Sequence, residues 1–465
     1  MKKRNWKIII VAMVTLLTGA LGACSKPVAI PEYTSDESFR FAAYMPPPGA
    51  NVGLGELKNN PDHITDENYK GISDCGFDHV YAIYEYAQEQ VLRALDFSEK
   101  YDLKYLARVP AISNHASRNA TPMTELSETL QQTMKNAVSA YKDHPAFAGI
   151  VGSDEPYANM FSTVGLIKSF FQEYLPDKEF FVNMIPIAFG GEDDYSTFGA
   201  ETYTDFIRQY IDEINPDFLS YDKYPYLRDA AGNPDLIINY FRNMEVFAEQ
   251  SKATGLPFQF FLLTMGHHAY RTPETYADIA FQIYTDMAFG ARGAATFTYW
   301  TTMSMGENIT HGLVDWYGNK QQSWYSMQEV ISEVRALEDA YMNFDWQSMI
   351  AFEADEDYPN YQFENLRTAA VVHAGDDTGH ARLKSIGGDN DYLAGAFTDK
   401  DGRDGFMLAN ASDPGLDVTV NLEIEFNDAQ KVLVYKKGRS VVYNLKKGKF
   451  NAVLNPGEGQ FVIPI

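Results

Sequence analysis

The sequence predicts an α/β protein in two parts, because the spacing of its apolar residues changes once along the chain. From residue 39 to about residue 340, eight short apolar runs alternate with amphipathic helical patterns, as expected of a (β/α)8 TIM barrel. From about residue 346 to residue 465, short alternating stretches are separated by turn signals such as Asn455-Pro-Gly457, which is typical of a β-sandwich. We therefore predict a barrel domain over residues 39–345 and a C-terminal antiparallel β-sandwich domain over residues 346–465.

The apolar runs are the predicted barrel strands. They are Phe39–Tyr44, Phe77–Tyr84, Leu103–Val109, Phe147–Gly152, Glu179–Ile185, Phe218–Tyr221, Pro257–Thr264 and Gly293–Tyr299. The intervening segments have helical spacing, and Thr272-Pro-Glu274 has the character of a helix start. The first strand leads into Met45-Pro-Pro-Pro-Gly49, which is not the glycine-rich phosphate loop of an open nucleotide-binding sheet. A closed barrel therefore fits better than an open sheet.

The N-terminus predicts a lipoprotein signal peptide over residues 1–23. A basic segment, Met1–Lys7, precedes an apolar segment, Ile8–Ala20, and Leu21-Gly-Ala-Cys24 resembles a bacterial lipobox. Cys24 is then the lipidated (palmitate-bearing) residue, and residues 24–38 are a short tether. The alternative is an uncleaved N-terminal membrane anchor. We expect a protein in the cell envelope, lipid-anchored to the membrane and facing outside the cytoplasm.

Net charge and cysteine content limit the binding partners and the disulfides that we expect of this protein. The formal net charge is −25, and loss of residues 1–23 would remove Lys2, Lys3, Arg4 and Lys7 and no acid, giving −29. So acidic a chain is not expected to bind nucleic acid. If Cys24 carries lipid, Cys75 has no disulfide partner and is expected to be a small buried residue.

Two carboxylates follow the predicted fourth strand. The segment Gly149–Tyr157 runs from an apolar strand directly into Asp154-Glu155-Pro156. Carboxylates at the end of a buried strand cost desolvation energy, and barrel chemistry occurs at the C-terminal ends of the strands. Glu155 is therefore the first candidate for a catalytic acid. The alternative is a carboxylate that bonds backbone amides at the turn from strand to helix.

Other strand ends supply further polar and aromatic residues. A glycosidic bond is broken by one carboxylic acid with a raised pKa and a second carboxylate that acts as nucleophile or base, and aromatic faces hold sugar rings. The predicted catalytic residues are Glu155, Asp222 and Asp154. The predicted substrate-binding residues are Trp300, Tyr224, Asn183, His267, Arg108 and Glu85.

No cofactor or metal is predicted. His267-His268 has no His or Glu partner four residues on. Asp399-Lys-Asp-Gly-Arg-Asp404 has acidic spacing but lacks the distal Glu of a calcium loop, so it is predicted to be a hairpin turn.

These motifs resemble the (β/α)8 glycoside hydrolases of the large retaining clan that includes β-galactosidases and cellulases. Asp154-Glu-Pro156, Tyr299-Trp300, Gly312–Gly318 and Tyr69–Asp78 carry the resemblance, which covers residues 39–340. It implies that Glu155 is the acid/base, that an Asn usually stands where Asp154 does, and that a strand-seven Glu is usually the nucleophile. Here the seventh strand reads Phe260-Phe-Leu-Leu-Thr-Met-Gly-His267 and has no carboxylate.

The second carboxylate therefore stays open between three possibilities. Asp222 could act as a base on water, Asp154 could assist a substrate acetamido group, or Glu85 or Glu307 could approach from a loop. The predicted function is a glycoside hydrolase that acts on an oligo- or polysaccharide. The alternative is a non-catalytic carbohydrate-binding lipoprotein, for which the missing strand-seven Glu argues.

Overall fold

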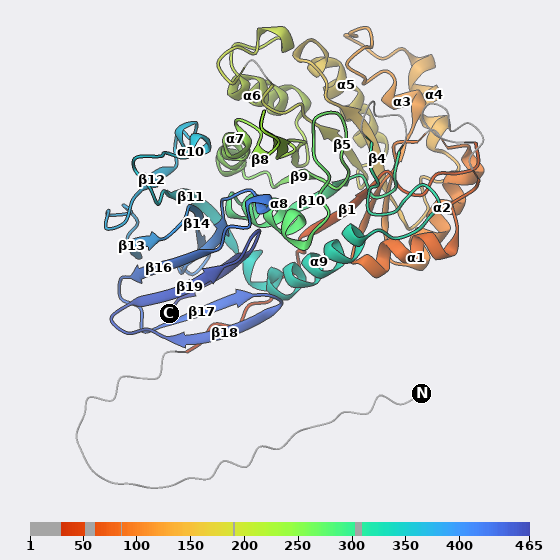
Figure 1. Ribbon diagram of the computed structural model, residues 1–465. Helices are drawn as coiled ribbons and strands as arrows, with labels where there is room; N and C mark the ends of the chain where they lie inside the picture. Colours follow the sequence, from red (N-terminus) through yellow and green to blue (C-terminus); the bar gives the residue numbers. More distant parts are fainter. Residues whose placement is uncertain (1–28, 52–60, 85, 189–190, 303–308) are drawn as a thin grey trace. The chain divides into compact units, whose positions relative to one another are not determined.

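A computed structural model describes residues 29–51, 61–84, 86–188, 191–302 and 309–465 (Figure 1). Residues Glu32–Ile465 form one compact unit. Cys24, Glu85, Glu307 and the predicted signal peptide lie outside the described residues. In the part of the chain that is described, no helix is long and apolar enough to cross a membrane.

Eight parallel strands form the predicted barrel. They are β1 (Arg40–Tyr44), β2 (His79–Tyr81), β3 (Lys104–Arg108), β4 (Phe147–Asp154), β5 (Glu179–Asn183), β6 (Leu219–Tyr221), β9 (Phe258–Leu263) and β10 (Gly293–Phe297). Their order in the sheet is β5-β4-β3-β2-β1-β10-β9-β6. A parallel bridge between Met184 and Tyr221 joins the two outer strands and closes the ring. The predicted TIM barrel is therefore confirmed, with a strand in each of the eight predicted places.

Helices connect the strands and cover the outside of the barrel (Figure 1). They are α1 (Asp66–Cys75), α2 (Gln88–Lys100), α3 (Pro110–Ser113), α4 (Glu128–Val138), α5 (Ala158–Tyr174), α6 (Tyr203–Ile214), α7 (Tyr240–Thr254), α8 (Tyr276–Ala288) and α9 (Gln322–Tyr341). A short 3-10 turn, Ser196–Phe198, precedes α6, and a small hairpin of β7 (Tyr226–Arg228) and β8 (Pro234–Leu236) follows β6.

The start of α8 differs from the prediction. Thr275 is its N-cap, and the Thr275 and Asp278 side chains cap each other's backbone N–H groups. Thr272, the predicted start, instead bonds Thr310 through its hydroxyl at 3.0 Å. This reciprocal pair satisfies the free N–H groups of the first turn, so the helix begins after Thr275.

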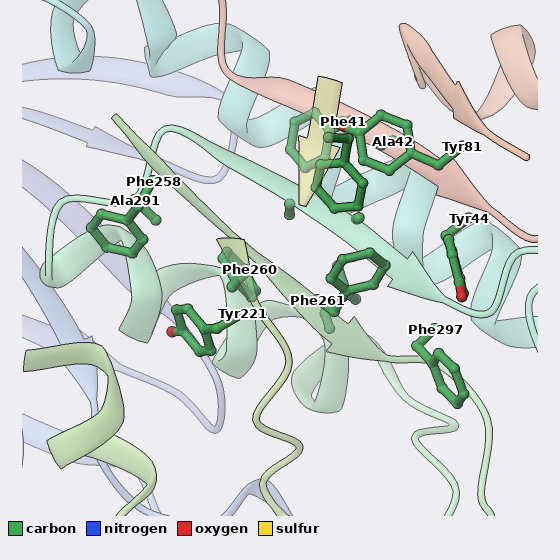
Figure 2. Packing of buried hydrophobic residues seen from close by; sticks show 14 of the residues in the cluster. Phe41, Ala42, Tyr44, Tyr81, Tyr221, Phe258, Phe260, Phe261, Ala291 and Phe297 are labelled. Carbon is green, nitrogen blue, oxygen red and sulfur yellow. The ribbon is translucent and has the colours of Figure 1, made fainter. Parts of the chain in front are cut away.

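Aromatic side chains fill the barrel interior. The Phe181 ring lies 4.8 Å from Tyr81, 5.8 Å from Phe218 and 6.1 Å from Phe261, between ring centroids. Tyr44 packs edge-on against Phe261 at 5.1 Å, and Figure 2 shows Tyr44, Tyr81 and Phe261 in this part of the core. The barrel is therefore a packed core rather than a pore.

The C-terminal part is the predicted β-sandwich. Its larger sheet has the order β12-β11-β14-β15-β20-β17-β18 and its smaller sheet the order β13-β16-β19. The strands are β11 (Phe344–Phe352), β12 (Ala370–Val372), β13 (Leu383–Gly388), β14 (Tyr392–Asp399), β15 (Asp404–Asn410), β16 (Val420–Phe426), β17 (Lys431–Lys436), β18 (Arg439–Asn444), β19 (Lys449–Leu454) and β20 (Gly459–Pro464). Two short helical turns, α10 (Tyr361–Glu364) and Pro414–Leu416, lie between strands. Residues 399–404 form the hairpin between β14 and β15, as predicted.

The two faces of the larger sheet have different partners. Leu393, Phe397 and Met407 belong to the same buried cluster as the barrel, whereas Leu408 and Val434 belong to a second cluster with the smaller sheet. Helix α9 ends at Tyr341 and β11 begins at Phe344. The two parts share a core, so the domain boundary at residues 345/346 stays a prediction.

Two further observations concern the predicted tether and Cys75. Within the predicted tether, Tyr33 packs on Phe344 at 5.4 Å, and Asn343 donates a hydrogen bond to the Thr34 carbonyl at 2.9 Å. Tyr33 and Thr34, although part of the predicted tether, therefore pack into the compact unit. Cys75 is buried and donates its thiol to the Trp324 carbonyl at 3.5 Å, in line with the expectation for a small buried residue.

Candidate active site

Strand β4 brings Asp154 and Glu155 to the C-terminal end of the barrel. The register between β4 and β5 shifts between Val151 and Ser153, and Glu155 then takes a left-handed backbone conformation with φ of 47°. Such a conformation costs a non-glycine residue about 1 kcal/mol and changes the direction of the side chain. The Glu155 N–H donates to the Asn183 carbonyl at 2.9 Å, which holds this turn against β5.

The carboxylate of Glu155 is paired with Arg118. The Arg118 guanidinium donates from Nη1 to Glu155 Oε2 at 2.5 Å. The side chain of Glu155 is 23 % exposed and that of Arg118 41 % exposed. Sequence reasoning missed Arg118, because this residue lies on the segment between α3 and α4 rather than at the end of a strand. The alternative, a Glu155 carboxylate bonded to backbone amides, is not what this contact shows.

Asn183 joins the carboxylates of neighbouring strands. Its Nδ2 donates to Asp222 Oδ1 at 2.9 Å, and its Oδ1 accepts from the Ser220 hydroxyl at 3.0 Å. A hydrogen bond from the same side chain lowers the pKa of Asp154. The Asn183 side chain is buried. Asn183, predicted to bind substrate, is thus placed between Asp154 on β4 and Asp222 after β6.

Burial raises the pKa of all three carboxyl groups. Asp222 is affected most, with a pKa well above its usual value because of burial and the charges of Glu155 and Asp154. The pKa of Glu155 is raised by burial and by Asp154, and the Arg118 charge opposes this. The pKa of Asp154 is raised by burial alone. The hydrogen bond from Asn183 and the charges of Arg118 and Arg108 lower it.

The carboxyl groups nevertheless reach solvent. Asp154 is exposed, and Glu155 and Asp222 are partly exposed. Protein therefore surrounds these carboxyl groups without closing them off from water. The charges of neighbouring carboxylates raise the pKa values of Glu155 and Asp222, so ionisation of one group disfavours ionisation of the next. Pairs of carboxyl groups with separated pKa values are the pattern of acid and base assignment in enzymes.

Two tyrosines lie near these carboxyl groups. The pKa values of Tyr44 and Tyr224 are raised well above 10, first by burial and then by the nearby carboxylates, with Asp222 acting on both. Tyr224 packs on Phe297 at 5.2 Å and on His267 at 5.7 Å. Tyr224 was predicted at this site, whereas Tyr44 was missed although it ends the first predicted strand.

His267 is a neutral imidazole beside Tyr224. Burial, and secondarily the charge of His268, lower its pKa to about 4. Its Nδ1 lies 3.2 Å from Nδ1 of His268, and its Nε2 has no hydrogen-bond partner among the described residues. A neutral imidazole can donate a hydrogen bond to a sugar hydroxyl, which is the predicted role of this residue.

Trp300 and Arg108, which were also predicted to bind substrate, have less direct links to the three carboxyl groups. Trp300 is 1 % exposed and packs against His63 at 4.7 Å, so its ring is not open to a sugar in this structure. Arg108 donates to Asn114 at 3.3 Å, and its charge lowers the pKa of Asp154 and of Tyr44.

Strand seven has no carboxylate in the structure either. It is β9, and residues Thr264-Met-Gly-His267 follow it. Among the described residues, no group of three or more His, Cys, Asp or Glu side chains is placed to hold a metal ion.

A separate cavity of about 870 Å³ opens at the N-terminal ends of the strands, opposite the carboxylates. Its lining residues include Arg40, His79, Lys104, Glu179 and Gln259. Barrel enzymes react at the other end, so we assign the candidate site by its chemistry rather than by cavity volume.

Comparison with known proteins shows what this chain is similar to. No family model and no curated protein sequence matches it. Among solved structures, a catalytic mutant of a GH42 β-galactosidase from G. stearothermophilus is 10 % identical, with a TM-score of 0.55 over 93 % of this chain and 99 % of that one. A β-galactosidase from Bacillus circulans sp. alkalophilus is 8 % identical, with a TM-score of 0.53 over 93 % and 100 %. These glycoside hydrolases share the fold, as the resemblance predicted.

Proposed function

We propose that this protein is a glycoside hydrolase that acts on a carbohydrate at the cell surface. The observation that carries the proposal is the group of three carboxyl groups, Asp154, Glu155 and Asp222, at the C-terminal end of the barrel: they reach solvent, and the charge of one raises the pKa of the next. Glycosidic cleavage needs one protonated and one ionised carboxyl group at the same place. The glycoside hydrolases that share the fold support the same reaction class.

Glu155 is the proposed general acid. Burial and the charge of Asp154 raise its pKa, which favours the protonated form that a general acid needs. Arg118 opposes the shift and is itself partly exposed, so the ion pair leaves Glu155 able to exchange protons with solvent. Asp222, two strands away, is the proposed base that activates water. His267 and Tyr224 are proposed to hold the sugar.

A second mechanism is favoured by the position of Asp154. This carboxylate lies next to the proposed acid and shares Asn183 with Asp222, while strand seven contributes no nucleophile. An N-acetylated sugar could then supply its own acetamido oxygen, with Asp154 or Asp222 orienting it. Substrates with and without the acetamido group distinguish the two mechanisms.

The test uses purified protein and a panel of aryl glycosides with gluco, galacto and N-acetylglucosamine configuration. Glu155→Gln is expected to lower kcat by about 10²- to 10⁴-fold, the range that general acid catalysis contributes. Asp222→Asn is expected to do the same, and the product anomer observed by NMR reports retention or inversion. Glu173→Gln, an exposed change on α5, is the control. Wild-type turnover in Glu155→Gln would refute the assignment.

The cell-surface location is a separate part of the proposal. It rests on the lipobox-like Leu21-Gly-Ala-Cys24. Labelling a bacterial host with an alkyne palmitate analogue is expected to tag the wild-type protein and Cys75→Ser but not Cys24→Ser. A protein that stays untagged in all three forms argues against lipidation.

A further inference from the structure

A row of polar side chains crosses the aromatic interior of the barrel beneath the candidate site. Such groups are costly to bury unless each one is hydrogen-bonded. The row begins at the N-terminal end of the strands and finishes at the carboxylates. Its members, in order, are Glu179, Arg40, Tyr81, Gln259, Ser220, Asn183 and Asp222.

Successive members are joined by hydrogen bonds. Arg40 Nη1 donates to the Tyr81 hydroxyl at 3.1 Å, and that hydroxyl donates to Gln259 Oε1 at 3.1 Å. Gln259 Nε2 donates to the Ser220 hydroxyl at 3.5 Å, the longest link. The Ser220 hydroxyl donates to Asn183 Oδ1 at 3.0 Å, and Asn183 Nδ2 donates to Asp222 Oδ1 at 2.9 Å.

The four central members are closed to solvent. Tyr81 and Ser220 are 0 % exposed, Gln259 is 2 % exposed and Asn183 is 3 % exposed. Water therefore cannot easily replace a broken link. A change at one link is expected to alter the next, because hydrogen bonds in a chain polarise and orient one another.

The Arg40–Glu179 end of the row determines which group donates and which accepts at each following hydrogen bond. A guanidinium has only donors, and Glu179 holds that of Arg40 through two bonds of 2.9 and 2.7 Å. The Tyr81 oxygen must accept from Arg40, so its hydrogen is directed to Gln259.

The same logic continues to the carboxylate. With Oε1 of Gln259 occupied by Tyr81, its amide nitrogen faces Ser220. The Ser220 hydrogen is then directed to Asn183 Oδ1. This leaves the Asn183 nitrogen, rather than its oxygen, facing Asp222.

We propose that Ser220, Gln259, Tyr81 and Arg40 are positioning residues that keep the Asn183 amide donor on Asp222, which favours the ionised form of Asp222, the proposed base, beside Glu155, the proposed acid. This inference rests on the proposed function for the roles of the two carboxyl groups. It adds residues that lie inside the barrel and touch no substrate.

Other groups also act on Asp222 and stay unchanged in the test. They are Asp154 and Glu155 from β4, Tyr44 from β1, and Lys223 and Tyr224 beside it in the chain. Tyr195 before α6, Tyr203 at the start of α6 and Tyr270 after β9 also lie near it. Burial and the two acids raise the pKa of Asp222, and the Asn183 bond lowers it. Loss of the Asn183 orientation should therefore raise that pKa further.

The experiment is a titration of aspartate side chains labelled with ¹³C at the carboxyl carbon, followed by NMR on the full chain, with Asp222→Asn to assign the signal. Ser220→Ala is expected to raise the pKa of Asp222 by about one pH unit, since a hydrogen bond to a charged group is worth about that much. Tyr81→Phe keeps the ring, removes the hydroxyl and is expected to cause a smaller rise. Ser98→Ala, which removes an equally buried hydroxyl bonded to Ala94 at 2.8 Å in α2, should cause none.

Tyr81→Phe is the decisive variant, because it is nearly isosteric and remains informative if Ser220→Ala does not fold. An Asp222 titration identical to wild type in Tyr81→Phe overturns the inference. The titration needs no substrate. A shift in the variants of a protein that cleaves no glycoside would retain the positioning row and reject the proposed function.

Discussion

Arg118 donates a hydrogen bond to Glu155 across 2.5 Å, from a segment 37 residues earlier in the chain. The contact places a positive charge on the proposed proton donor, where burial and Asp154 act in the opposite direction. The protonation of Glu155 is therefore a balance of opposed effects, and removing one of them should move it measurably.

Replacement of Arg118 by alanine is expected to raise the pKa of Glu155, because the ionised carboxylate loses its cation. The general acid must be protonated to act, so the alkaline limb of the kcat/KM profile should move to higher pH. The shift should be about half a pH unit, since Arg118 is partly exposed and its charge is screened. Arg439→Ala, an exposed change in the sandwich, should leave the profile in place. A shift of the alkaline limb to lower pH would contradict this account.

Glu245 on α7 joins the barrel to the segment between α10 and β12 of the sandwich. Its carboxylate accepts the backbone N–H groups of Arg367, Thr368 and Ala369 at 2.8–2.9 Å and pairs with Arg242 at 2.5 Å. It is 0 % exposed. Glu245→Ala leaves these donors without an acceptor and should lower the free energy of unfolding by about 3–5 kcal/mol. Urea denaturation measures this.

Glu249→Ala is the matched control for that change. Glu249 lies one turn further along α7, is 26 % exposed and approaches Arg242 only to 3.9 Å. Its loss should cost less than about 1 kcal/mol. Equal midpoints for the two variants would show that the Glu245 contacts contribute little.

Asp286 on α8 predicts a pH dependence of stability. It is 1 % exposed and accepts a hydrogen bond from the Tyr221 hydroxyl. Burial raises its pKa well above the usual value, against the Tyr221 bond. A carboxyl group whose pKa is higher in the folded state contributes stability below its unfolded pKa and loses it as pH rises.

Asp286→Asn does not titrate, so the comparison isolates this group. The stability of the variant relative to wild type should increase as pH rises from about 4, the unfolded aspartate value, toward 8. Thermal unfolding at several pH values measures the difference. A difference that stays constant across this range would refute a raised Asp286 pKa.

The sandwich approaches the barrel closely at Gly395. A Cβ atom at this position of β14 would lie 1.8 Å from the Ala288 carbonyl oxygen at the end of α8. Gly395→Ala must therefore separate the two elements and should cost about 1–3 kcal/mol or more. Gly387→Ala in β13, where the same atom meets nothing within 4 Å, is the control. Similar melting temperatures for both variants would contradict the close contact.

The fold could be predicted from sequence because its signals are local. Each barrel strand is a short apolar run followed by a helical pattern, and the period of the apolar residues changes near residue 346. The same reasoning placed Glu155 and Asp222 at the C-terminal strand ends, where the structure has them, since a barrel brings its strand ends together. The lack of a carboxylate after the seventh strand was also visible in the residues themselves.

Tertiary structure decided what these residues contact. Arg118 reaches Glu155 from a loop, and Trp300 packs against His63, more than two hundred residues earlier in the chain. The start of α8 depended on which threonine finds a reciprocal partner, and Thr275 does so with Asp278. The sequence by itself thus determined the barrel, the sandwich and the strand ends, because backbone periodicity is read within a few residues. Ion pairs and buried hydrogen bonds such as that of Ser220 with Asn183 join distant positions, so only the closed barrel could determine them.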